Sequence, residues 1–159
     1  MKTIRNRLDV IDSVKSASQD SFANCETAAF HGRKVVESIA FGCLVAIENG
    51  LRVVPNDAHG QWNAEKIFKG LLKKKIDLFP NPSFLRDPTP EEFESSKSKF
   101  VVQGIPEKCL THSEIILIYQ NFHKWLHEVN PYTTDKHSSF LSRHKESLWS
   151  DLSRLNDLI

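Results

Sequence analysis

The chain has 159 residues, of which 40% are hydrophobic and 26% are charged, a composition typical of a globular domain that buries its own core. Its 21 basic and 20 acidic side chains leave a formal net charge of +1, so the overall charge does not indicate a nucleic-acid partner. The three cysteines form no Cys-x-x-Cys pair, which excludes a zinc ribbon and a thioredoxin-like redox motif. We expect a single domain over residues 1–159.

The first residues lead into an amphipathic pattern and lack the apolar segment of a secretory signal. The longest apolar stretch, residues 35–51, is too interrupted by polar side chains to span a bilayer; these are Glu37, Ser38, Glu48 and Asn49. We therefore expect a soluble, cytoplasmic protein with no membrane partner.

Apolar residues at helical spacing predict two helices in the first third of the chain, over about 3–18 and 21–48. The second helix has little polar surface between Val35 and Ile47, which is typical of a helix at the centre of a bundle. Gly50 provides its C-terminal stop, because glycine adopts the left-handed backbone conformation without steric cost.

The middle of the chain predicts a loop at 52–60 and a third helix at 62–75. The buried face of this helix is expected to hold Trp62, Ile67, Phe68, Leu71 and Leu72. Residues 76–90 include four prolines and read as mostly extended. Apolar pairs within 78–85 and residues 99–103 predict a small two-stranded β ribbon.

Two capping boxes mark further helix starts, Thr89-Pro90-Glu91-Glu92 for a short helix and Thr111-His-Ser-Glu114 for a long one. The long helix carries an apolar stripe to Val129, and Asn130-Pro131 is expected to end it. A last helix is predicted over about 138–156. The expected fold is mainly α: one helical bundle of five to six helices, with at most the small ribbon.

His123 and His127 lie one helical turn apart, beside the predicted apolar stripe and close to Asn130. This spacing suits acid–base chemistry or a pair of metal ligands, and the Asn130 amide could orient a phosphate beside His127. The glutamate of a His-Glu-x-x-His metalloprotease is absent, because Lys124 follows His123. No third ligand is evident, so we predict no metal site, and ordinary surface or capping histidines are the simpler interpretation.

Two other segments are candidates for binding. Arg33 and Glu37 are four residues apart within the otherwise apolar second helix, where they form either a surface ion pair or part of a polar pocket. His59 and Trp62 stand in a loop before a helix, where anions can bind, although a loop anchored by Trp62 explains them equally. The sequence has no P-loop, dinucleotide fingerprint or nucleophile elbow, so we expect no cofactor.

Three segments together resemble bacterial helical proteins related to the HEPN-like domains; they are residues 30–39, residues 62–67 with 79–82, and residues 125–132. The likeness covers about residues 22–132 and is one of pattern. It implies a small helical bundle, often dimeric, from a toxin–antitoxin or phage-defence setting, and some members of such families are metal-independent RNases. Those RNases place an arginine four to six residues before a catalytic histidine.

No segment reproduces this catalytic motif in full. No arginine precedes His127 at the required distance, and Arg143-His144 are adjacent. The stretch from Arg52 to His59 matches the spacing formally, but Val53 follows the arginine and Pro55 disfavours a helix there. The resemblance therefore supports the fold more than the chemistry.

The sequence supports two main functional hypotheses. A metalloprotein centred on His123 and His127 is a third hypothesis, ranked after both. The first is a non-catalytic interaction protein in a mobile-element or defence context, expected to be a homodimer with an RNA or protein partner and without a DNA-binding motif. The alternative is a metal-independent endoribonuclease that uses His127 as acid–base, with Asn130 beside it and Arg33 or Lys124 stabilising the phosphate.

Overall fold

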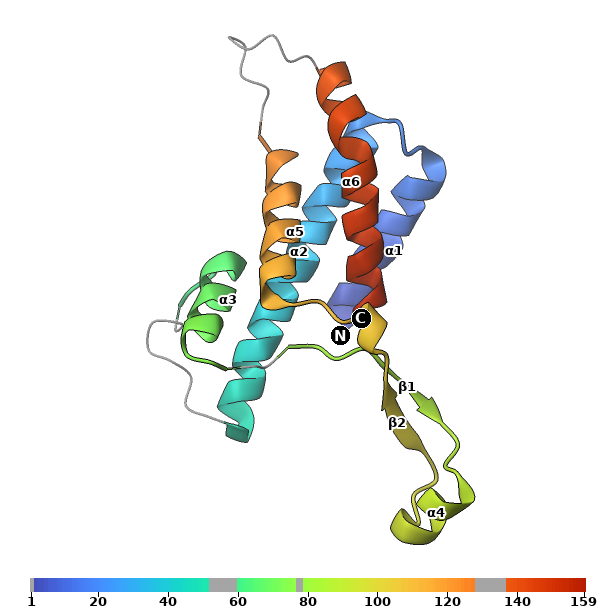
Figure 1. The fold of residues 1–159 in the computed structure, drawn as a ribbon. Helices are drawn as coiled ribbons and strands as arrows, with labels where there is room; N and C mark the ends of the chain where they lie inside the picture. The colour runs from blue at the N-terminus through green and yellow to red at the C-terminus, as the bar shows by residue number, and fades with distance from the viewer. Residues whose placement is uncertain (1, 52–59, 77–78, 128–136) are drawn as a thin grey trace.

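The computed structural model describes residues 2–51, 60–76, 79–127 and 137–159, and the fold is mainly α with a small two-stranded sheet (Figure 1). The elements follow in chain order: α1 (Lys2–Ala17), α2 (Phe22–Ala46), a π-type turn (Ile47–Leu51), α3 (Ala64–Lys73), β1 (Ser83–Arg86), α4 (Pro90–Ser96), β2 (Val101–Gly104), a 3-10 turn (Pro106–Lys108), α5 (His112–Lys124) and α6 (His137–Asp157). The mainly α fold expected from the sequence is confirmed.

Helix α2 is the centre of the bundle and packs against α1, α3, α5 and α6. Ten of its residues are buried, as the nearly continuous apolar pattern predicted. The helices approach closely at Gly32, where an added Cβ would lie 2.7 Å from Leu152 of α6 and 2.9 Å from Phe122 of α5. No helix among the described residues, α2 included, is long and apolar enough to cross a membrane.

Local sequence signals set the helix ends. Thr89 and Thr111 form the two predicted capping boxes, with Glu92 and Glu114. At the end of the second helix Gly50 has a φ of 115°, so the predicted glycine stop is also confirmed.

The predicted ribbon forms as an antiparallel pair in which Leu85 faces Val102 and Phe84 faces Gln103. Its strands are shorter than the predicted ranges, because β1 begins at Ser83, directly after Pro82. Between the strands the chain forms α4, and the segment Ser83–Gly104, called the arm below, projects from one end of the bundle (Figure 1).

Two predictions about helix boundaries were wrong. The third helix begins at Ala64 behind the N-cap Asn63, which leaves Trp62 outside it and 67% exposed; Leu72 is exposed as well. Helix α5 ends at Lys124 and not at Asn130, because Trp125 and Leu126 donate to carbonyls three residues back and tighten the last turn. Asn130-Pro131 lies outside the described residues.

The Gly32 contact predicts a specific stability effect. Gly32→Ala should lower the free energy of unfolding by about 1–3 kcal/mol, because the new methyl group overpacks the contact with Phe122 and Leu152. Gly42→Ala is the matched control in the same helix. No atom lies within 4 Å of the Cβ position there, so alanine should raise stability by about 0.5–1 kcal/mol. Urea unfolding of both variants measures the difference, and equal effects at the two sites would contradict the close packing.

Candidate functional site

The candidate site begins with a buried carboxylate on α2. Glu37 is only 7% exposed and accepts hydrogen bonds from Arg33 Nε (3.1 Å), Lys34 Nζ (2.6 Å) and the Tyr119 hydroxyl of α5 (3.4 Å). A buried charge is costly unless it is paired and hydrogen-bonded, and Glu37 is both. The predicted Arg33–Glu37 pair therefore exists, and it lies at the junction of α2 and α5.

Arg33 extends this junction toward the two histidines. Its guanidinium lies 5.3 Å from the centre of the Tyr119 ring, and its Nη1 lies 3.0 Å from Nδ1 of His123. Nε2 of His123 is in turn 2.9 Å from Nε2 of His127, with the two rings nearly perpendicular. Arg33, Glu37, His123 and His127, which the sequence marked separately, thus come together.

The donor groups determine which ring nitrogens of His123 and His127 carry a proton. Arginine can only donate, so Nδ1 of His123 accepts and carries no proton. The neutral His123 ring then holds its proton on Nε2 and donates it to Nε2 of His127. Arg33, His123 and His127 therefore form one directed chain of hydrogen bonds that requires both rings to be neutral.

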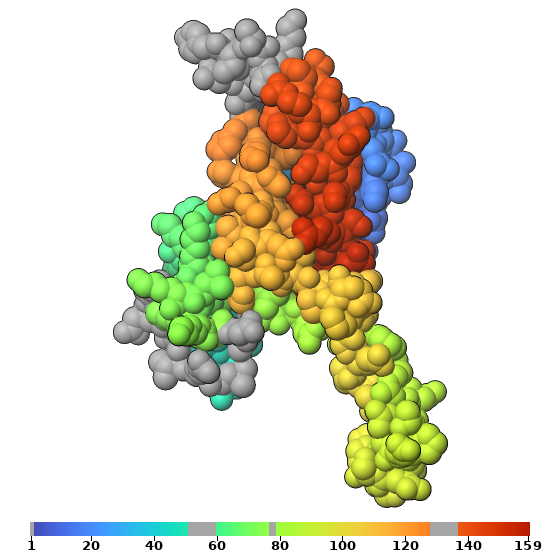
Figure 2. Space-filling view, in the orientation of Figure 1, coloured from blue at the N-terminus to red at the C-terminus, as the bar shows by residue number. Residues whose placement is uncertain are grey.

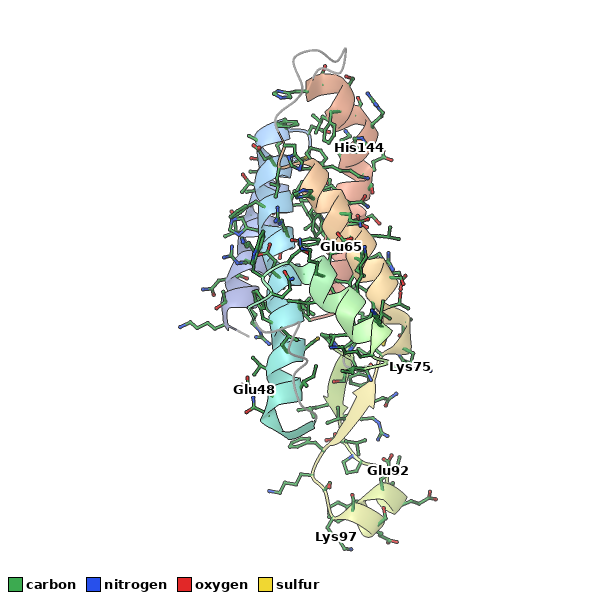
Figure 3. All side chains as sticks on the ribbon, turned by 90° about the vertical axis from the view of Figure 1, so that its left-hand side faces the viewer. Glu48, Glu65, Lys75, Glu92, Lys97 and His144 are labelled. Carbon is green, nitrogen blue, oxygen red and sulfur yellow. The ribbon has the colours of Figure 1, made fainter. Side chains whose placement is uncertain are left out.

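Helix α3 adds an acidic group to the edge of the cluster. Glu65, labelled on α3 in Figure 3, accepts from Lys69 Nζ (2.5 Å) and from Gln120 Nε2 of α5 (3.0 Å). The hydrogen bond from Lys69 lowers the pKa of Glu65, which stays ionised. Burial, the neighbouring His127 and Arg33 lower the pKa of His123, and Glu65 opposes this shift. Burial raises the pKa of the Tyr119 phenol.

Sequence reasoning placed some candidates elsewhere and missed others. Trp62 is exposed before α3 and is not among the residues that form the cluster, while His59 and Asn130 lie outside the described residues. Tyr119 was given no functional role from the sequence, although its spacing of four residues from His123 puts both on one face of α5. No local signal linked Glu65 to this site.

In this arrangement the nitrogens that could act as a base are already occupied. Nδ1 of His123 accepts from Arg33, and Nε2 of His127 accepts from His123. The carboxylate of Glu37 is held by three donors. Among the described residues, no three His, Cys, Asp or Glu side chains are grouped closely enough to hold a metal ion. The geometry therefore favours a structural role, in which the polar cluster holds α2 and α5 together, over a catalytic centre with unoccupied groups.

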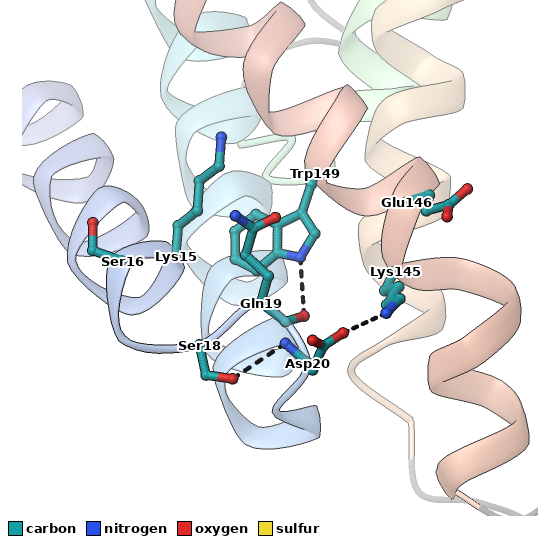
Figure 4. Close-up of a pocket in the computed structure, with 8 residues that line it drawn as sticks. All are labelled: Lys15, Ser16, Ser18, Gln19, Asp20, Lys145, Glu146 and Trp149. Carbon is teal, nitrogen blue, oxygen red and sulfur yellow. Dashed lines mark hydrogen bonds and ion pairs between the residues drawn. The ribbon is translucent and has the colours of Figure 1, made fainter.

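A separate hollow of about 700 Å³ lies where the turn between α1 and α2 meets α6 (Figure 4). Trp149 Nε1 donates to the Gln19 carbonyl (3.3 Å), and Lys145 pairs with Asp20 across the opening. Its other lining side chains include Lys15 and Glu146, so charges of both signs surround it. These two contacts join lining residues to one another and single out no ligand chemistry.

Comparisons of the chain with protein-family models, with curated proteins and with solved structures found no match.

The hydrogen-bond chain predicts a pH dependence of stability. The pKa of His123 in the folded protein is below its ordinary 6.5, so between these two values the unfolded state binds more protons. The stabilising contribution of His123 is complete above about pH 6.5 and is lost as the pH falls below it.

This dependence can be measured as the urea midpoint at about pH 7.5 and about pH 5.5. His123→Gln, which does not titrate, should show a smaller loss on acidification than the wild type. His31, whose pKa is also lowered, is present in both proteins and contributes equally to them. Identical losses in the two proteins would contradict the assignment to His123.

Proposed function

We propose that this chain is a non-catalytic interaction protein that binds another protein through the arm. In this proposal it keeps the HEPN-like character that its sequence pattern indicates, and it acts in the cytoplasm, as a homodimer, in a mobile-element or defence context. The observation that carries the proposal is the arm itself: none of its residues is buried, and five of its large apolar side chains are exposed, namely Phe84, Leu85, Phe93, Phe100 and Val102.

The arm has no hydrophobic core of its own beneath its exposed apolar side chains. An isolated two-stranded hairpin is at best marginally stable in water, and each strand here has only four residues. Helix α4 has no buried residue that could anchor the hairpin. Grouped exposed apolar side chains on an otherwise polar protein are typical of binding surfaces.

The arm is nevertheless ordered by its own polar contacts. The Arg86 guanidinium donates to both oxygens of Glu92 at 2.8 Å and to the side chain of Gln103 at 2.6 Å. The bond from Arg86, supported by Thr89, lowers the pKa of Glu92 to about 2. A preformed element loses less conformational entropy when it binds, which suits an interaction surface.

Charge on the arm favours a protein partner over a nucleic acid. The arm holds three basic residues (Arg86, Lys97 and Lys99) and four acidic ones (Asp87, Glu91, Glu92 and Glu94), so its formal charge is 3 − 4 = −1. Nucleic-acid affinity depends on neutralising phosphates with lysine and arginine, and this surface has no basic excess to do so.

A test in cells compares two exposed positions. A photo-crosslinking amino acid at Leu85 (66% exposed, on the arm) should give covalent adducts with protein. The same residue at Leu117 (60% exposed, on α5) is the matched control and should give none above background. Gel analysis of irradiated cells measures both, and adducts at Leu117 alone, or at neither position, would contradict the proposal.

The second candidate is a metal-independent endoribonuclease that uses His127, and the convergence of Arg33 with His123 and His127 favours it. Opening of the hydrogen-bond chain would free His127 Nε2 as a base and leave Arg33 near a phosphate. Asn130 cannot be assigned a place in this mechanism, because it lies outside the described residues.

Cleavage of total cellular RNA in the presence of EDTA separates the two functions. The interaction proposal predicts no cleavage by the purified wild-type protein. The ribonuclease hypothesis predicts cleavage that His127→Ala abolishes and His31→Ala leaves unchanged. His31 is the matched control because it also contacts an arginine, Arg7, with its Nδ1 3.3 Å from Arg7 Nη1, yet lies outside the cluster.

A further inference from the structure

We propose that the partner of the arm is a second copy of this chain, packed arm against arm about a two-fold axis. The inference rests on the proposed function, since it specifies what covers the arm. It differs from a general expectation of dimerisation because it assigns the interface to Ser83–Gly104 and leaves the helical bundle out of it.

The sheet of the arm offers one apolar face for this contact. Leu85 and Val102 are directly opposite in the register, so their side chains point to the same face of the sheet. They are 66% and 68% exposed. The other face carries Phe84 beside the hydrogen bond between Arg86 and Gln103, which satisfies polar groups there. Apolar contact is therefore directed to the Leu85–Val102 face.

The apolar area that two arms can bury together corresponds to a small interface. Phe84 faces the opposite side of the sheet with Gln103, so four of the five side chains can contribute, each exposing on the order of 100 Å². One arm therefore offers roughly 400 Å² of apolar surface, and two arms together roughly 800 Å². Specific interfaces bury about 1,000 Å² or more with their polar rim included, so the expected dimer is small and reversible.

The arm carries charges of both signs, so two identical arms can pair them with each other. Arg86 is already paired with Glu92, and the remaining charged side chains have both signs; they are Asp87, Glu91, Glu94, Lys97 and Lys99. When the α4 ends of two arms lie side by side, the glutamates of α4 in one copy can face Lys97 and Lys99 of the other. A two-fold axis makes each such contact twice, which is the usual symmetry of soluble dimers.

The position of the arm leaves room for a second copy. Figure 2 shows the arm extending away from the helices, and Figure 3 shows Glu92 and Lys97 at its far end, well separated from His144 on α6. A second arm can therefore lie alongside without meeting the bundle.

Analytical ultracentrifugation over a range of concentrations tests this inference with purified full-length protein. The wild type should sediment as a reversible monomer–dimer mixture. Val102→Lys and Leu85→Lys should each raise the dissociation constant at least about tenfold, because each places a charge in the apolar contact. Leu117→Lys is the matched control, with similar exposure on α5, and should change the constant by less than about twofold. Circular dichroism confirms that each variant is folded.

The outcomes separate this inference from the proposed function. A wild type that stays monomeric up to about 1 mM overturns the second copy as the partner. A dimer that both arm variants leave intact overturns it as well, because the interface then lies elsewhere. In either case, a crosslink from Leu85 to a different protein in cells would keep the arm as the interaction surface. An adduct of twice the chain mass at Leu85, together with dimers lost in both variants, supports the second copy.

Discussion

The close contact of α2 with α5 and α6 at Gly32 is the constraint on which the bundle depends. A glycine at this point lets Phe122 and Leu152 approach the backbone of α2 to a distance that a Cβ would prevent. The helices packed around α2 bury ten of its residues, and the charged Glu37 is one of them. Burial of that charge then requires partners, and α5 supplies one of them through Tyr119.

The need to pair the buried charge of Glu37 explains how the polar cluster is arranged. Arg33 satisfies Glu37 and, with its remaining donors, orients His123, which in turn donates to His127. Catalytic side chains need free lone pairs or protons at the place where a substrate binds, and here the neighbours use those groups. The cluster therefore stabilises the contact between α2 and α5, while the arm carries the apolar surface that a partner can cover.

The sequence predicted the features that depend on local spacing. Helical periodicity indicated the helices, the two threonine–glutamate boxes marked the starts of α4 and α5, and Arg33 with Glu37 formed the expected pair. The contact between Arg33 and His123 joins residues 90 positions apart and has no local signal. The exposure of Leu85 and Val102 could not be predicted either, because apolar residues in a strand do not show whether another element covers them.

Amide hydrogen exchange of the arm at increasing protein concentration tests the central claim most directly. If a second copy covers the arm, peptides within residues 83–104 will exchange more slowly as the concentration rises, while peptides of α3 will not change. Exchange of the arm that is fast and independent of concentration would show that copies of the chain do not cover it, and would contradict the account.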